Sequence, residues 1–224
     1  MGKFLVYQFR RVYAANPAFF VFFSIWVFLL TFSVAFVPKA DSFHFINSHH
    51  AFWADILFTI YTYFGDGLFV ITVFIAYCCM QQWNCARAIL GTYIFSGVIC
   101  CMLKNLFHVD RPASVFHGDP TFHVVSWLPV AYFNSFPSGH TTSAFAMSAT
   151  IAIVSKNRSF GILTFVFAAL TAYSRVYLGQ HFVIDVWFGS MLGTVTACIY
   201  LLAMPYILKS KRMSFSLRFL QVKF

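Results

Sequence analysis

The feature that most constrains this chain is a series of long apolar runs separated by short polar connections. Of its 224 residues, 60% are apolar and 9% are charged, whereas globular domains average about 45–50% and about 25%. The run at 18–37 has the roughly 20 residues that a helix needs to cross a bilayer. The composition therefore predicts an all-α polytopic membrane protein.

Six apolar runs fit membrane-spanning helices. They cover residues 18–37, 67–82, 88–103, 139–155, 159–175 and 182–204. The second to fourth runs fall short of the ideal length of about 20 residues. An aromatic segment at 52–64 is expected to lie along the membrane interface, and the proline-containing connection 104–138 is expected to be a loop. These features predict one membrane domain covering residues 1–224.

The distribution of charge predicts how this domain is oriented. Eleven of the 15 basic residues fall in the terminal segments and in alternate connections: Lys3, Arg10, Arg11, Arg87, Lys156, Arg158, Lys209, Lys211, Arg212, Arg218 and Lys223. All six acidic residues are Asp, and they fall toward the opposite side. By the positive-inside rule both termini are cytoplasmic and the connection 104–138 is outside. Because the basic residues form no stripe, we expect no nucleic-acid partner.

Six ionisable residues are expected at one end of the bundle. They are Lys104, Arg111, His140, Arg175, His181 and Asp185. A charge at the centre of a membrane helix costs about 2.5–3.5 kcal/mol, so ionisable residues in membrane segments usually mark function. Separate parts of the chain deliver these residues to the same depth on the outer side, which predicts a site there.

His181 and Asp185 are four residues apart, so they share a face if the sixth span begins there. A carboxylate in that position can take the proton of one ring nitrogen and leave the other nucleophilic. Gly189, Gly193 and Ala197 continue the same face. Small residues allow close helix approach, which would turn the His–Asp pair inward.

The segment before the fourth run is typical of a phosphate site. Ser138 is a favoured N-cap, and Gly139 lets the backbone approach a ligand closely. Free amides at a helix N-terminus bind phosphate. Lys104, Arg111 and Arg175 supply positive charge, and an arginine can bind two phosphate oxygens at once.

These residues occur in three spaced motifs that resemble the signatures of the type 2 phosphatidic acid phosphatase (PAP2) family. They lie inside a six-span pattern that this family shares, and the wider superfamily also includes the vanadium-dependent haloperoxidases. The motifs read Lys104-x6-Arg111-Pro112, Pro137-Ser138-Gly139-His140 and Ser174-Arg175-x5-His181-x3-Asp185.

The resemblance implies a role for each motif residue. His181 would attack phosphorus, Asp185 would orient His181, and His140 would protonate the leaving oxygen and later activate water. The phosphate oxygens would be held by Lys104, Arg111, Ser138, Gly139 and Arg175. No metal and no other cofactor is implied. Asp66, between two glycines at the start of the second run, is either a contact near the substrate or a plain interfacial turn.

We therefore expect a metal-independent phosphatase of an envelope lipid, with undecaprenyl diphosphate or a lipid A phosphate favoured. The alternatives are a phosphatidic acid or phosphatidylglycerophosphate phosphatase, and a lipid-to-lipid phosphotransferase. A transporter is disfavoured because its ionisable residues should lie near the bilayer midplane. The expected partner is a lipid phosphate in the outer leaflet of a bacterial inner membrane, with no obligate protein partner.

Overall fold

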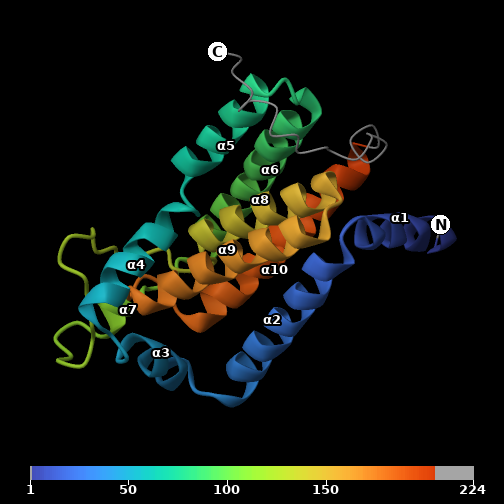
Figure 1. Cartoon of the computed structure of the whole chain (residues 1–224). Helices are drawn as coiled ribbons and strands as arrows, with labels where there is room; N and C mark the ends of the chain where they lie inside the picture. The colour runs from blue at the N-terminus through green and yellow to red at the C-terminus, as the bar shows by residue number, and fades with distance from the viewer. Residues whose placement is uncertain (1, 205–224) are drawn as a thin grey trace, which may run out of the picture.

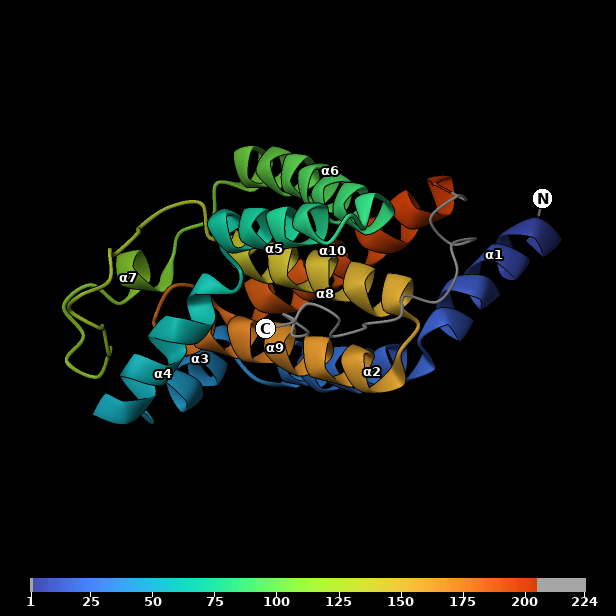
Figure 2. The same ribbon diagram turned by 45° about the horizontal axis from the view of Figure 1, so that its top comes forward.

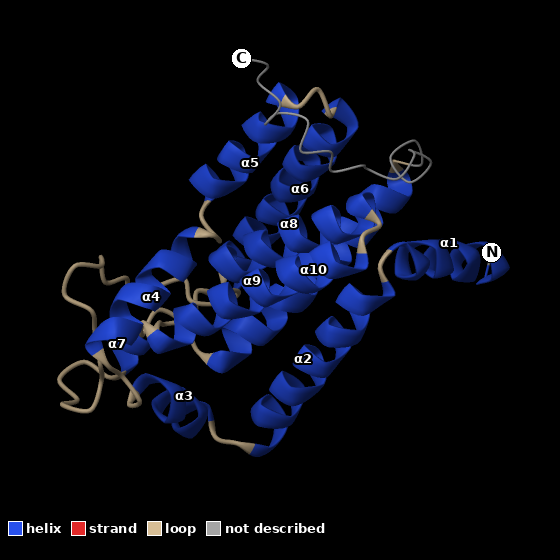
Figure 3. Ribbon diagram, viewed as in Figure 1, coloured by secondary structure: helices blue, strands red, loops and turns tan. Residues whose placement is uncertain are grey.

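The computed structural model describes residues 2–204, with side chains from residue 9 onward. Over that range the chain is helical without strands (Figure 3). The helices are α1 (Gly2–Ala15), α2 (Pro17–Phe36), α3 (Lys39–Asn47), α4 (Phe52–Tyr63), α5 (Gly67–Cys79), α6 (Trp83–Phe107), α7 (Pro112–Val115), α8 (Gly139–Ser155), α9 (Arg158–Tyr177) and α10 (Val183–Ala203). The all-α prediction is confirmed.

Four described segments are long and apolar enough to cross a membrane, and the pair α4–α5 makes a fifth if it is one bent span. Helix α8 has 17 residues and α5 has 13, so the predicted count of six spans stays a prediction. Helix α6 extends beyond the predicted third span, 88–103, at both ends. It includes both charged residues that bounded the predicted run, Arg87 in its second turn and Lys104 in its last turn.

Helix α8 lies at the centre of the bundle, beside α6, α9 and α10 (Figures 1 and 2). Fourteen of its 17 residues are buried. A helix covered on all sides needs no lipid-facing stripe, so it can carry hydroxyl side chains that bond within the protein. Thr150, for example, donates to Thr92 of α6 over 2.9 Å.

Glycines on α10 bring this helix against α8. A Cβ atom added at Gly193 would lie 2.3 Å from the carbonyl oxygen of Thr142, and one at Gly189 would lie 2.9 Å from that of Ser138. The predicted close approach of a second helix is therefore present. It brings the first turns of α8 and α10 together, where the amide of Ser138 donates to the carbonyl of Asp185 over 3.1 Å.

The chain bends by 57° between α4 and α5. Helix α4 packs on α9, whereas α5 packs mainly on α6. Asp66 caps α5 by accepting from the amide of Leu68 over 2.8 Å. At Gly65 an added Cβ atom would lie 2.6 Å from the carbonyl oxygen of His140, so the bend sits directly against the first turn of α8.

The basic residues predicted near the C-terminus lie outside the described residues. They are Lys209, Lys211, Arg212, Arg218 and Lys223.

Candidate active site

The predicted site residues meet where α9 ends and where α8 and α10 begin. His181 lies in the connection from α9 to α10, two residues before α10 starts. Its amide donates to the carbonyl of Arg175 over 3.1 Å, and its side chain is buried, with 1% of its surface exposed. The fold thus places an imidazole in the interior of the bundle end.

Asp185 and Ser135 hold one edge of the His181 ring. The Nδ1 atom of His181 lies 3.4 Å from Oδ2 of Asp185 and 3.4 Å from Oγ of Ser135. Ser135 donates to the same Oδ2 over 2.5 Å, and the amide of Phe182 donates to it over 2.9 Å. Because an ionised carboxylate only accepts hydrogen bonds, Nδ1 carries the ring proton. The lone pair is then on Nε2, on the opposite edge of the ring.

Ser135 was not predicted from the sequence. It comes from the loop before α8, where its amide donates to the carbonyl of Val109 over 2.7 Å. A serine in a proline-containing loop carries no spacing signal. Only the folded loop shows that its hydroxyl contacts both the ring and the carboxylate.

Arg111 is held by three hydrogen bonds. Its Nε donates to the carbonyl of Phe133 over 2.9 Å, and its Nη1 donates to both oxygens of Gln180 over 3.3 Å each. These bonds leave Nη2 without a partner among the described residues. Lys104, in the last turn of α6, donates to the carbonyl of Asn134 over 2.6 Å.

Arg175, in the last turn of α9, is buried, with 7% of its surface exposed. Its Nη1 donates to the hydroxyl of Thr62 in α4, and its Nε is buried without a partner in the described part of the chain. A buried, unpaired guanidinium donor is costly. An anion at this point would satisfy it, and Thr62 is a positioning contact that the sequence pattern did not indicate.

The first turn of α8 supplies backbone donors. Ser138 caps the helix, accepting from the Thr141 hydroxyl over 2.9 Å and from the Thr141 amide over 3.5 Å. The amides of Gly139 and His140 are in the first two helical positions, which have no partner inside a helix. A Cβ atom at Gly139 would come within 3.9 Å of the Lys104 side chain, so the lysine reaches this helix end.

His140 lies at the more open side of the site. Its side chain is 34% exposed, and its Nε2 is 3.9 Å from Oδ2 of Asp66. Asp66 thus caps α5 and also faces a predicted site residue, while its contact with a substrate stays a prediction.

Burial lowers the pKa of His181 well below its ordinary value, and the positive charges of Arg111, Arg175 and Lys104 lower it further. The imidazole is therefore neutral at pH 7. The site thus combines a neutral buried imidazole with three surrounding cations, which suits an anionic ligand.

A second polar network lies behind the site. Asp55 accepts from the Tyr177 hydroxyl over 2.7 Å and lies 2.9 Å from Nε2 of His123. Asn47 donates to the carbonyls of His123 and Tyr177 over 3.0 and 2.9 Å. His50 stacks on His123 with ring centroids 3.8 Å apart. These residues tie the outer loop and α3–α4 to the end of α9.

The fold and the geometry define a class of helical membrane protein with a histidine-containing candidate anion site at one end of the bundle. A model of the PAP2 superfamily matches residues 86–209, more than half of the chain. The chain therefore belongs to the PAP2 superfamily, and it is an integral membrane protein.

Comparison with known proteins gives the same family. The chain is 35% identical over 100 residues to undecaprenyl-diphosphatase BcrC of Bacillus subtilis, covering 45% of this chain and 48% of that protein. It is 31% identical over 113 residues to lipid A 1-phosphatase of Rhizobium etli, covering 49% and 47%. It thus spans about half the length of these curated relatives. The solved structure of Aquifex aeolicus LpxE is similar at a TM-score of 0.67 and 25% identity, covering 75% of this chain and 96% of that one.

Proposed function

We propose that this protein is a membrane lipid phosphatase in which His181 is the nucleophile. The observation that carries the proposal is the neutral, buried imidazole of His181, which Asp185 and Ser135 hold on its Nδ1 edge while three cations surround it. A neutral ring with a fixed lone pair can attack phosphorus, whereas a protonated ring cannot. The cations provide the charge stabilisation that phosphoryl transfer chiefly requires.

The reaction takes place in two balanced steps. The Nε2 lone pair of His181 forms a bond to phosphorus while the bond from phosphorus to the lipid-side oxygen breaks. Once the negative charge of the bound phosphate offsets the surrounding cations, His140 can carry a proton. It gives this proton to that oxygen, so the lipid leaves as a neutral alcohol, or as a lipid monophosphate when the substrate is a diphosphate. Water then attacks the phosphohistidine, His140 takes a proton from the water, and inorganic phosphate leaves.

Side chains and amides take the place of a metal ion in this site. Lys104, Arg111 and Arg175 contribute positive charge, and the amides of Gly139 and His140 contribute donors at the helix N-terminus. The Nε of Arg175, buried without a partner among the described residues, is a donor that a phosphate oxygen would satisfy. We therefore infer a metal-independent reaction.

The substrate we propose is an envelope lipid, with undecaprenyl diphosphate or a lipid A phosphate favoured. The names of two relatives support this choice, one an undecaprenyl-diphosphatase and the other a lipid A 1-phosphatase. Phosphatidic acid and phosphatidylglycerophosphate remain alternatives, as does transfer of the phosphoryl group to a second lipid. The distribution of basic residues supports cytoplasmic termini and a site on the outer face of a bacterial inner membrane.

The test is release of inorganic phosphate from a panel of lipid phosphates in mixed micelles, combined with rapid quench of ³²P-labelled substrate. Wild type should release phosphate and carry acid-labile label, and His181→Ala should do neither. The matched control is His117→Ala, because His117 is an exposed histidine of the outer loop. Label transferred to a second lipid instead of to water would identify the phosphotransferase, and substantial turnover by His181→Ala would refute the proposed nucleophile.

A further inference from the structure

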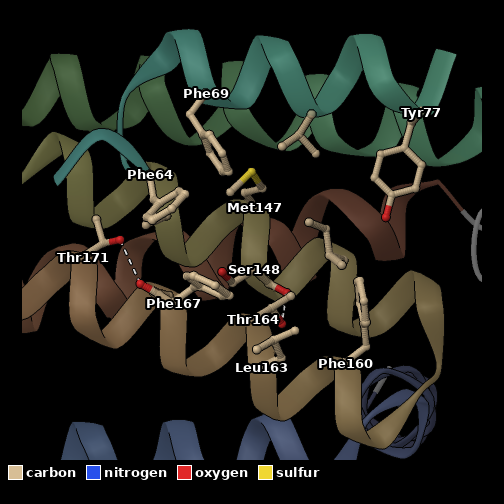
Figure 4. Close-up of a pocket in the computed structure, with 14 residues that line it drawn as sticks. Phe64, Phe69, Tyr77, Met147, Ser148, Phe160, Leu163, Thr164, Phe167 and Thr171 are labelled. Carbon is tan, nitrogen blue, oxygen red and sulfur yellow. Dashed lines mark hydrogen bonds between the residues drawn. The ribbon is translucent and has the colours of Figure 1, made fainter. Parts of the chain in front are cut away.

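An apolar groove of about 250 Å³ lies between α5, α8 and α9 (Figure 4). Aromatic side chains from α5 and α9 and the Met147 side chain of α8 face one another across it. Among its few polar groups, the Thr164 hydroxyl lies 3.2 Å from the carbonyl oxygen of Gly161 and 3.4 Å from that of Ser148. The groove therefore offers hydrocarbon contacts and almost no hydrogen-bonding sites.

The bend between α4 and α5 explains why the groove exists. Helix α4 packs on α9, but after the 57° bend α5 turns toward α6 and leaves α9. The space between α5 and α9 is then filled only by side chains. Leu163 and Phe167, which line the groove from α9, are 48% and 37% exposed. The groove is therefore open sideways, toward the bilayer.

The outer end of the groove lies one helical turn from the candidate active site. Ala144 lines the groove one helical turn from His140 on α8, and Thr171 lines it one turn from Arg175 on α9. Phe64, which also lines it, precedes the glycine that packs on the backbone of His140. The groove thus begins on α8 and α9, near His140 and Arg175. Lys104 and Arg111 lie on other elements, α6 and the outer loop.

We propose that this groove holds the hydrocarbon chain of the substrate while His181 attacks the phosphate. The inference rests on the proposed function. A general acid must lie within hydrogen-bond reach of the oxygen it protonates, so the leaving oxygen is next to His140. The chain attached to that oxygen leaves the site on the same side, where the groove begins.

The size of the groove indicates what kind of lipid it takes. Pockets for drug-sized ligands usually measure about 300–1,000 Å³, so this one holds a single chain. From Thr171 to Phe160 the groove follows eleven residues of α9, about 16 Å at the helical rise. Flexible Met147 and the aromatic rings suit an irregular chain. The groove therefore favours a phosphate on one prenyl chain over a lipid A phosphate with several acyl chains.

The test introduces a bulky side chain halfway along the groove. Thr164 is half-buried in the wall, seven residues from Thr171, so Thr164→Phe would block the groove about 10 Å from its outer end. The matched control is Val166→Phe on the same helix, because Val166 is 43% exposed and does not line the groove. Each protein is assayed in mixed micelles on alkyl phosphates of increasing chain length and on polyprenyl diphosphate.

For wild type and Val166→Phe, we expect kcat/KM to rise with chain length until the chain fills about 16 Å, and then to level off. In Thr164→Phe the rise should stop at a shorter chain. Its ratio of kcat/KM between the longest and the shortest substrate should fall at least tenfold. An unchanged profile, or an equal loss on every chain length in Thr164→Phe, would overturn the assignment of the groove.

Photolabelling tests the groove without turnover. Dodecyl phosphate with a diazirine at its terminal carbon should label peptides from α5, α8 and α9 in wild type, and Thr164→Phe should lose that label. Labelling confined to α2 or α6, or label unaffected by Thr164→Phe, would refute the proposal. If wild type hydrolyses none of the phosphates but labels the groove, the proposed function fails and the groove remains a lipid-chain site.

Discussion

Replacing Ser135 by alanine tests whether its hydroxyl positions the His181–Asp185 pair. Ser135 and Asp185 are both fully buried, and the hydroxyl donates to Oδ2 over 2.5 Å. A hydrogen bond to a charged group contributes about 1.5–3 kcal/mol. If that loss falls on the transition state, the rate decreases about 10- to 150-fold, at about 1.4 kcal/mol for each factor of ten. The decrease is partial because the amide of Phe182 still donates to the same oxygen.

The assay for Ser135→Ala is phosphate release from a lipid phosphate over a range of substrate concentrations. Because the hydroxyl faces the Nδ1 edge of His181, away from the attacking Nε2, we expect the loss in kcat and little change in KM. The matched control is Ser96→Ala, since Ser96 is equally buried but bonds only to the carbonyl of Tyr93 in its own helix. A kcat within twofold of wild type, or a loss confined to KM, would refute the positioning role.

Four further predictions follow from the site and the bundle. Gly193→Val should lower the free energy of unfolding by at least the roughly 1–3 kcal/mol typical of overpacking, because the added Cβ would clash with the backbone of α8. An unchanged melting temperature would contradict this prediction. Because the pKa of His181 is lowered in the folded protein, the unfolded chain binds more protons below about pH 6.5. Acidification from pH 7.5 to 5 should therefore destabilise wild type more than His181→Ala, by at most about 1.4 kcal/mol per pH unit. Equal decreases in the melting temperatures of the two proteins would refute this prediction. Excess EDTA should leave turnover nearly unchanged and vanadate should inhibit, whereas a strict Mg²⁺ requirement would contradict the site. A single cysteine at Thr121 should label from outside, and one at Asn157 only after permeabilisation; the reverse would invert the topology.

The sequence predicted much of the bundle because apolar runs and their limits are local features. The predicted runs 18–37, 159–175 and 182–204 match α2, α9 and α10 to within two residues. The run 88–103 missed both ends of α6, because a charge in a terminal turn looks the same in sequence as a charge in a loop. The bend between α4 and α5 also escaped prediction, since it depends on which neighbour each helix packs against.

The motif residues were predicted from their spacing, and the structure brings them together at one end of the bundle. Their roles in catalysis stay predictions. Ser135 and Thr62 were missed because each reaches the site through tertiary packing, one from a loop and the other from α4. The groove was missed for the same reason. Its lining comes from three helices whose apolar residues, taken singly, look like ordinary lipid-facing positions.

The central position of α8 has a consequence for how the protein is made in the membrane. This helix carries six hydroxyl side chains, Thr141, Thr142, Ser143, Ser148, Thr150 and Ser155, and most of its surface is covered by protein. Thr142, Thr150 and Ser155 bond to carbonyls at or within α8 itself. Outside the bundle the cost therefore falls on the hydroxyls that lack such a bond, because unsatisfied polar groups are costly in hydrocarbon. Stable insertion of α8 therefore depends on α9 and α10, which are synthesised after it. A ribosome stalled before α10 emerges should leave α8 exchanging with water or with the translocation channel, and α8 should become fixed in the bilayer only once α10 has packed against it.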